Sequence, residues 1–161
     1  MTDDTDNGTV DLPPALLPDC YVAAPFGAPT RAEQEANTRR AEAIGEIMVA
    51  RGCRPIVVHT AILAGAFGDD NDPAARARGL AATVEIMRDV LARGGTLVVL
   101  LRDDCTMSAG VLAEVTEARR MAPGLRIMAM TAAGWEALND SMVYADEMRL
   151  GWQNAEWNLT P

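Results

Sequence analysis

The stretch that decides the fold is TLVVLLRDD at residues 96–104, followed by CTMSAG at residues 105–110. Its continuous apolar run is typical of a strand that is buried on both faces, as in a parallel sheet. The polar residues that follow predict a turn, and Ser108 has a side chain suited to capping the first turn of a helix. The order strand, turn and helix is the repeating unit of an α/β fold.

The helix that Ser108 is expected to open carries Glu114 beside its apolar side. The stripe expected to face the sheet consists of Val111, Leu112, Val115, Ala118 and Ala122. Glu114 lies at the edge of this stripe, and it should cover the turn around Gly110 because helical side chains lean toward the N-terminus. Gly110 has no side chain that would block a ligand there. Glu114 is therefore a candidate catalytic residue; the alternative is a solvated glutamate beside a glycine that eases helix packing.

The composition limits the classes of function. The chain has 161 residues and a formal net charge of -9, and all 14 of its basic residues are arginines. A length of this order is typical of one domain. The absence of lysine excludes a Schiff-base lysine and a Walker-type phosphate loop. An acidic chain is repelled by a nucleic-acid backbone, so we expect a small-molecule ligand and no nucleic-acid polymer.

The cysteines and the single histidine favour neither a metal centre nor a disulfide framework. Cys20, Cys53 and Cys105 are odd in number and widely spaced, and His59 stands alone. We therefore expect no metal site and a reducing, cytoplasmic environment, and separately no organic cofactor is implied. No apolar stretch approaches the roughly 18 residues that span a bilayer, and no leader pattern is present, so no membrane association is expected.

Further strands and helices are expected on both sides of the opening stretch. Residues 1–17 read as a loosely ordered tail, 18–140 as the α/β domain, and 141–161 as a tail that packs on the domain or on a partner subunit. Within the domain, the patterns predict strands at 20–24, 55–59 and 126–130, helices from 31 to 50 and from 73 to about 93, a loop at 60–72 that is a candidate lid, and a short helix after Thr131.

Alternating strands and helices predict a three-layer, flavodoxin/Rossmann-like fold, with a parallel sheet that has helices on both faces. In the strand order 2-1-3-4, the topology reverses between the first and third strands. Ligands bind at such a reversal, beside the carboxyl ends of the strands. The loops expected to meet there span residues 25–30 and 102–110, which are also the chemically richest parts of the chain.

Three motifs make the chain resemble the nucleoside 2-deoxyribosyltransferase superfamily, including its nucleotide N-hydrolase branch and uncharacterised phage and bacterial relatives. The motifs are YVAAPF at 21–26 with Asn37 in the next helix, PIVVH at 55–59, and Ser108-x-Gly110-x-x-x-Glu114-x-x-x-Ala118. Together they span roughly residues 19 to 131. The resemblance implies cleavage of the N-glycosidic bond of a nucleoside or nucleoside 5'-monophosphate, by hydrolysis or by base transfer, with Glu114 as the nucleophile.

The resemblance and the sequence together give a set of expected site residues. Asp103 is a candidate second catalytic carboxylate, and Asp104 is a candidate for holding sugar hydroxyls; turn capping is the alternative for both. Ser108 matches the hydrolase branch, in which a serine helps to hold a 5'-phosphate, and Arg102 or Arg31 could add positive charge. The other expected substrate-binding residues are Tyr21, Ala24, Pro25, Phe26, Gly27, His59 and Gly110.

Several alternatives remain open from the sequence. The family often has an acid at the position where this chain has Gly79, which favours a rival hypothesis of a module that binds a nucleotide or NAD derivative without cleaving it. His59 is either a substrate contact or a hydrogen-bonded structural residue, and Cys105 oriented by His59 would give a cysteine hydrolase. Trp152 and Trp157 suggest packing against a second copy, so a homodimer or higher oligomer is expected.

Overall fold

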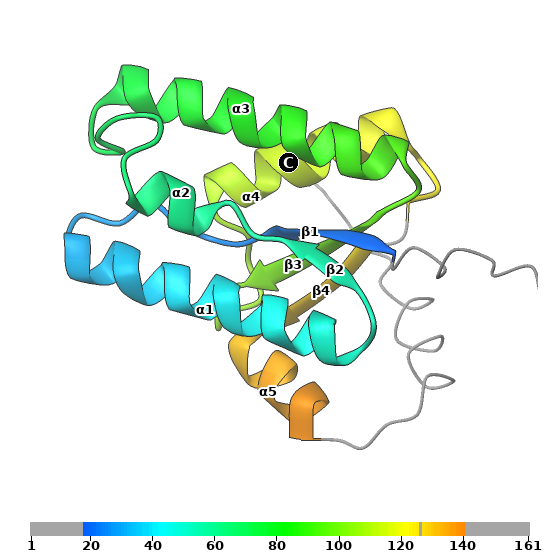
Figure 1. Ribbon diagram of the computed structural model, residues 1–161. Coiled ribbons are helices and arrows are strands. Elements are labelled where there is room, and N and C mark those ends of the chain that lie inside the picture. Colours follow the sequence, from blue (N-terminus) through cyan, green and yellow to red (C-terminus); the bar gives the residue numbers. More distant parts are fainter. Residues whose placement is uncertain (1–17, 126, 141–161) are drawn as a thin grey trace, which may run out of the picture.

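The computed structural model describes residues 18–125 and 127–140 (Figure 1). The tails expected at 1–17 and 141–161, with Trp152 and Trp157, lie outside these residues. The elements in chain order are β1 (Asp19–Ala23), α1 (Arg31–Ala50), β2 (Arg54–Ile56), α2 (His59–Leu63), α3 (Pro73–Ala92), β3 (Thr96–Leu101), α4 (Ala109–Met121), β4 (Ile127–Thr131) and α5 (Ala132–Asp140).

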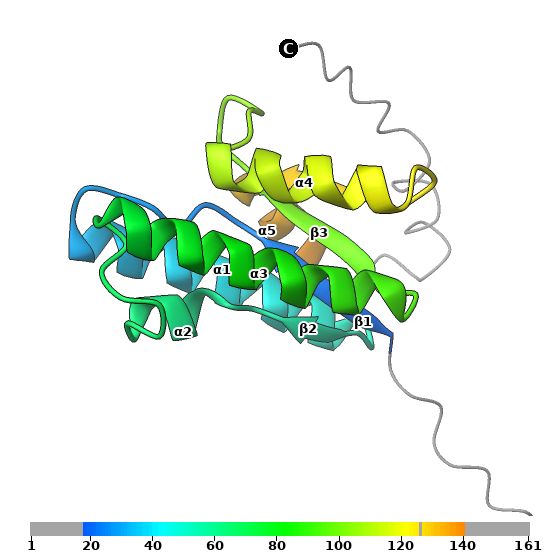
Figure 2. The ribbon, with the colours of Figure 1, turned by 90° about the horizontal axis from the view of Figure 1, so that it is seen from above.

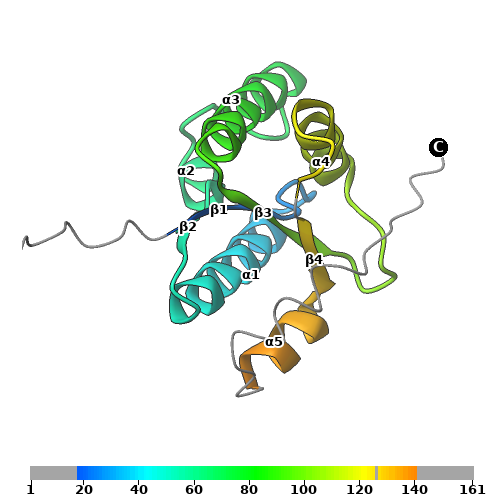
Figure 3. The same cartoon turned by 90° about the vertical axis from the view of Figure 1, so that its right-hand side faces the viewer.

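The four strands form one parallel sheet in the order β2-β1-β3-β4, as the sequence predicts. Tyr21 lies opposite Ile56 on one side and Leu97 on the other, which fixes the register of the central strand. Helices cover both faces of the sheet, with α3 and α4 on one side and α1 and α5 on the other (Figure 3). The fold is therefore the expected three-layer α/β architecture.

The helix boundaries follow the capping residues that the sequence contains. Thr30 and Glu33 form a capping box at the start of α1, and the Asp72 carboxylate accepts hydrogen bonds from the first backbone N–H groups of α3. Ser108 Oγ accepts the Val111 N–H at the start of α4. Thr131 Oγ1 accepts the Gly134 N–H at the start of α5. These four predicted caps are confirmed.

The predicted second strand is wrong at its carboxyl end. Within the residues that the structure describes, β2 is an edge strand that pairs with β1, and the pairing ends at Ile56. Val57 and Val58 lie beyond it, and His59 begins the short helix α2 instead of ending a strand. The residues predicted as one long loop at 60–72 therefore contain most of α2, and an irregular loop follows it. The fourth strand is also one residue later than predicted.

The two faces of the sheet bury different cores. On the α1 and α5 face, Trp135 is fully buried and its indole N–H donates to the Val99 carbonyl at 3.3 Å. On the other face, Met87 and Val90 of α3 and the α4 stripe pack on the sheet. Leu112 was predicted to belong to that stripe but is 43% exposed. The side of α4 that faces the sheet therefore consists of Val111, Val115 and Ala118.

Helices α3 and α4 lie side by side over the sheet (Figure 2) and are joined by an ion pair. Arg88 of α3 donates to Glu117 of α4 through Nε at 2.9 Å and Nη2 at 2.6 Å. Arg120 also donates to Glu117, and these two arginines lower the pKa of that carboxyl to about 2. The contact links the helices one turn beyond Glu114.

Candidate active site

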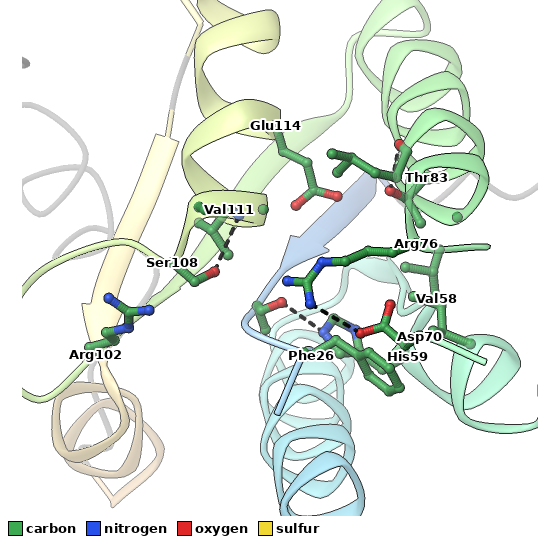
Figure 4. A pocket seen from close by; sticks show the side chains of 17 residues that line it. Phe26, Val58, His59, Asp70, Arg76, Thr83, Arg102, Ser108, Val111 and Glu114 are labelled. Carbon is green, nitrogen blue, oxygen red and sulfur yellow. Dashed lines mark hydrogen bonds and ion pairs between the residues drawn. The ribbon is translucent and has the colours of Figure 1, made fainter. Parts of the chain in front are cut away.

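A cavity of about 300 Å³ opens at the carboxyl edge of the sheet (Figure 4). Its wall is built from the β1–α1 turn, the segment around α2, the first half of α3 and the start of α4. The two loops predicted to meet at the reversal of strand order both contribute, through Phe26 and Gly27 and through Arg102 and Ser108. Pockets of this size and position bind small molecules.

Glu114 lines this cavity although it is only 6% exposed. Its Oε1 accepts a hydrogen bond of 2.6 Å from the hydroxyl of Tyr21, which is fully buried in β1. Burial is the largest influence on the carboxyl group and raises its pKa to about 7. Burial and the nearby Glu114 carboxylate raise the pKa of Tyr21, so this phenol keeps its proton and acts as the donor.

Thr83 of α3 lies beside the same carboxyl group and also lines the cavity. The Tyr21 hydroxyl and, next to it, the Thr83 hydroxyl lower the pKa of Glu114 and partly oppose the effect of burial. The Thr83 hydroxyl donates to the Leu80 carbonyl of its own helix at 3.0 Å. The two hydroxyl groups come from different elements, β1 and α3, so the position of Glu114 depends on the packing of the whole α3 and α4 face. Sequence patterns gave no indication of Thr83.

The start of α4 lies open to the cavity. Ser108 caps the helix through Oγ, and its hydroxyl hydrogen can still be donated to a ligand. A Cβ placed on Gly110 would have nothing within 4 Å, which agrees with the prediction that this position leaves room for a ligand. Backbone N–H groups at the first turn of a helix favour anions, so this side of the cavity suits a negatively charged or hydroxyl-rich group.

His59 lines the cavity and supports the β1–α1 turn. Its Nε2 lies 2.8 Å from the Ala24 carbonyl oxygen, and because a carbonyl only accepts, Nε2 carries the proton. Burial lowers the pKa of His59, so the ring is neutral at neutral pH. The ring also packs edge-on against Phe26 with centroids 5.9 Å apart. The structure thus supports the structural hydrogen bond for His59 and places the ring in the cavity wall, while a substrate contact stays a prediction.

The structure brings together most of the predicted site residues but not all of them. Ala24, Phe26, Gly27, His59, Ser108, Gly110 and Glu114 line the cavity. Tyr21 contacts the Glu114 carboxylate from within the sheet instead of forming the wall, and Pro25 is also outside the lining.

The two predicted aspartates occupy the turn after β3. Asp103 and Asp104 are exposed and do not line the cavity. Asp104 accepts hydrogen bonds from the Thr106 backbone N–H at 3.0 Å and hydroxyl at 2.6 Å, which lower its pKa. Turn capping, the alternative considered for these residues, is therefore what the geometry of Asp104 supports. Neither carboxylate is placed to act on a ligand in the cavity.

Cys105 is exposed in the same turn and has φ of 64°, an uncommon left-handed conformation for a residue with a side chain. It does not line the cavity that contains His59. The geometry therefore does not support a cysteine nucleophile oriented by His59. Arg31 is also outside the cavity lining, where its side chain pairs with Glu35 and donates to the Leu63 carbonyl.

Two charged residues of the cavity were not predicted. Arg76 of α3 and Asp70 of the preceding loop both line it and form an ion pair of 3.5 Å. Arg102, one of the two arginines suggested from the sequence, lines it as well. In the part of the chain that the structure describes, no three His, Cys, Asp or Glu side chains form a group that could hold a metal ion.

The fold and the cavity define the class of protein: an α/β domain with a small-ligand pocket at the carboxyl edge of a parallel sheet. More particularly, residues 18–128 match the model of a family described as a domain of unknown function, DUF7768, and the chain belongs to that family. No curated protein and no solved structure gives a significant match to the chain. Among the helices of the described residues, none is long and apolar enough to cross a membrane.

Proposed function

We propose that the protein cleaves the N-glycosidic bond of a nucleoside or a nucleoside 5'-monophosphate, with Glu114 as the nucleophile and hydrolysis favoured over base transfer. The observation that carries this proposal is the position of Glu114. It is buried, it has no cation as a hydrogen-bond partner among residues 18–125 and 127–140, and it lines an open cavity at the reversal of strand order. Carboxylates in such environments are frequent catalytic groups.

The proposed reaction has two steps. In the first, a Glu114 carboxylate oxygen forms a bond to the anomeric carbon while the bond from that carbon to the base nitrogen breaks. The bonding electron pair leaves with the base, which takes up a proton from water. In the second, water attacks the same carbon, the ester to Glu114 breaks, and the carboxylate is restored while the water loses a proton. Transfer to a second base instead of water would give base exchange.

The surroundings of Glu114 suit the nucleophile role. The Tyr21 hydroxyl fixes one carboxylate oxygen at 2.6 Å and so orients the group toward a sugar in the cavity. The nucleophile must be ionised, and the Glu114 pKa of about 7 allows this at and above neutral pH. Desolvation keeps the carboxylate from being shielded by water.

The remaining wall suits the other parts of such a substrate. The Phe26 ring provides an aromatic surface for a base. Ser108, Gly110 and Arg102 lie around the start of α4 and offer donors to sugar hydroxyls or a 5'-phosphate. The order and spacing of YVAAPF, Ser108, Gly110 and Glu114, which resemble the deoxyribosyltransferase superfamily, point to the same substrates.

The odd cysteine count favours a reducing compartment, and we propose the cytoplasm. We also propose that the protein forms a homo-oligomer.

The test is release of free base from a panel of the four deoxynucleosides, their 5'-monophosphates and NAD, measured by chromatography. We expect release from at least one member of the panel, and Glu114→Ala should abolish it. Glu46→Ala, at an exposed position of α1, is the matched control and should retain the activity. Release that survives Glu114→Ala would contradict the proposal.

A binding module for the same ligands is the second candidate, and one observation favours it. Position 79, where the resembled family often has an acid, is a glycine in the cavity wall. The Asp70 carboxylate, which also lines the cavity, is already engaged in the ion pair with Arg76. A ligand that raises the melting temperature without releasing base would favour this candidate over the enzyme.

A further inference from the structure

Arg76 occupies the middle of the cavity that contains Glu114. It lies in the first turns of α3, where the Asp72 side chain caps the backbone and Pro73 starts the helix. Its side chain crosses from α3 toward the β1–α1 turn, so that the guanidinium lies between Glu114 above and Phe26 below in Figure 4. The backbone at position 76 is therefore held by the helix, whereas the guanidinium lies in the space that a ligand would enter.

Gly27 makes room for this guanidinium. A Cβ added at position 27 would lie 2.6 Å from both terminal nitrogens of Arg76, which is far inside van der Waals contact. The φ angle of Gly27 is not in the left-handed region, so the backbone itself does not require glycine there. The absent side chain matters because it lets Arg76 reach the cavity beside the β1–α1 turn.

Asp70 holds Arg76 only loosely. The two charged groups are 3.5 Å apart, longer than the roughly 2.7–2.9 Å of a strong charged hydrogen bond. The Arg76 side chain is 55% exposed, while that of Asp70 is 15% exposed. A ligand anion with several oxygens can form the paired, short hydrogen bonds that the guanidinium fork favours, and it would compete well with this contact.

We infer that Arg76 is the residue that binds the monoester phosphate of the substrate and so selects nucleoside 5'-monophosphates over nucleosides. Asp70 holds the guanidinium in the empty cavity, and Gly27 provides the space for it. Arg102 and the start of α4 line the opposite side of the cavity, so a phosphate beside Arg76 would face positive charge from two directions. The inference rests on the proposed function for the nucleoside part of the ligand.

The experiment measures calorimetric binding of the four deoxynucleoside 5'-monophosphates and the four deoxynucleosides to the full chain carrying Glu114→Gln, which prevents turnover. At least one monophosphate should bind more tightly than its nucleoside. Arg76→Ala should weaken the binding of that monophosphate by about tenfold or more, and the binding of the nucleoside by less than about threefold. Arg39→Ala removes the same charge from an exposed position of α1 and is the matched control.

Two further variants separate recognition from a merely structural role. Gly27→Ala should leave the circular dichroism spectrum unchanged, because the flexible end of Arg76 can move away, but it should weaken the monophosphate as Arg76→Ala does. Asp70→Asn should strengthen monophosphate binding, since it removes both the competing partner and a negative charge. If Arg76 served only to stabilise the loop at 64–72, Asp70→Asn would weaken binding instead.

Equal effects of Arg76→Ala on monophosphate and nucleoside, no effect on either, or failure of every monophosphate to bind would overturn the inference. The proposed function fails separately, and its failure is seen in the wild-type chain. If monophosphates bind through Arg76 but no base is released, the cleavage proposal is wrong and the phosphate site stands. If base is released from nucleosides and Arg76→Ala does not discriminate, the cleavage proposal stands and the phosphate site is wrong.

Discussion

Two buried carboxylates lie at opposite ends of the same sheet, and their surroundings differ. Asp19 begins β1 and is 8% exposed; Glu114 lines the cavity at the carboxyl edge of the sheet and is 6% exposed. Asp19 accepts hydrogen bonds from Arg54 at 2.5 Å and Arg93 at 3.3 Å, and these lower its pKa. Glu114 accepts from the neutral Tyr21 hydroxyl, and burial raises its pKa to about 7.

The difference separates a structural group from a reactive one. A buried carboxylate that is paired with cations is stabilised in its charged form and ties elements together, as Asp19 ties β1 to the first residue of β2 and to the residue that ends α3. A buried carboxylate without a cation costs free energy whenever it is ionised. The fold retains such a group beside a cavity, which is the arrangement expected where the group serves chemistry instead of stability.

The largest expected effect comes from Glu114→Gln. Loss of the nucleophile should reduce base release by at least about a thousandfold. The same change should stabilise the protein at pH 8 relative to the wild type by about 3 kcal/mol, because the wild-type carboxyl has a folded pKa of about 7 against an ordinary value of 4.5. Base release and urea unfolding at pH 5 and pH 8 check both parts.

The sign of the stability effect follows from proton binding. Between pH 4.5 and 7 the folded wild type keeps a proton on Glu114 that the unfolded chain has lost. Wild-type stability therefore falls as the pH rises through this window, and the loss is complete above it. The glutamine variant lacks this contribution. Equal pH dependence in the two proteins would show that Glu114 is not an uncompensated carboxyl group.

Tyr21→Phe is expected to have the next largest effect. The variant removes the hydroxyl whose hydrogen bond lowers the pKa of Glu114, so this pKa should rise above about 7. The midpoint of the pH–rate profile should then move toward alkaline pH by about one unit, and the rate at pH 7 should fall several-fold. An unchanged midpoint would mean that Tyr21 does not control the protonation of Glu114.

Asp19→Asn should affect stability but not activity. Loss of the charge removes the pairing with Arg54 and Arg93, so the melting temperature at pH 7 should fall by a few degrees. Since the folded pKa of Asp19 lies below its ordinary 3.8, the wild-type advantage is present above that value and is lost as the pH falls through the folded pKa. A loss of base release in this variant would contradict the separation of the two carboxylates.

The smallest expected effect comes from Thr83→Val. The hydroxyl of Thr83 also lowers the pKa of Glu114, but it ranks after Tyr21 among the causes. The midpoint of the pH–rate profile should shift in the same direction as for Tyr21→Phe and by less, about half a unit. Thr83→Ser keeps the hydroxyl and is the matched control. A larger shift for Thr83→Val than for Tyr21→Phe would reverse this order.

Much of the fold and the candidate role of Glu114 could be predicted from the sequence, because local rules determine the features concerned, whereas the pairing of Asp19 was not predicted. The unbroken apolar run at 96–101 predicts a central strand. The capping residues Thr30, Asp72 and Ser108 predict where three helices begin, and the structure has helices that begin there. Strands that alternate with helices restrict the topology to a few choices, and the order of the four strands was predicted correctly. The position of Glu114 over Gly110 was predicted from their spacing of four residues within one helix.

The other side of the cavity could not be predicted, because it depends on how α3 crosses the sheet. The side chains of Arg76 and Thr83 face Glu114 only once α3 is placed beside α4, and Asp70 joins them through an irregular loop. Gly27 was predicted as part of the turn at 25–30. The contact that needs a glycine at this position, the approach of Arg76, is a tertiary contact that the sequence does not reveal. His59 was placed in a strand because Val57 and Val58 favour strands, whereas pairing at this edge stops at Ile56.

Titration of the carboxyl groups tests the central claim most directly. Carboxyl carbon shifts of the folded protein, labelled with ¹³C at Asp and Glu and assigned with Glu114→Gln and Asp19→Asn, give both pKa values in one experiment. We predict a midpoint near 7 for Glu114 and one below 3.8 for Asp19. A Glu114 midpoint near 4.5 would contradict the account, because the carboxyl group would then be an ordinary solvated one.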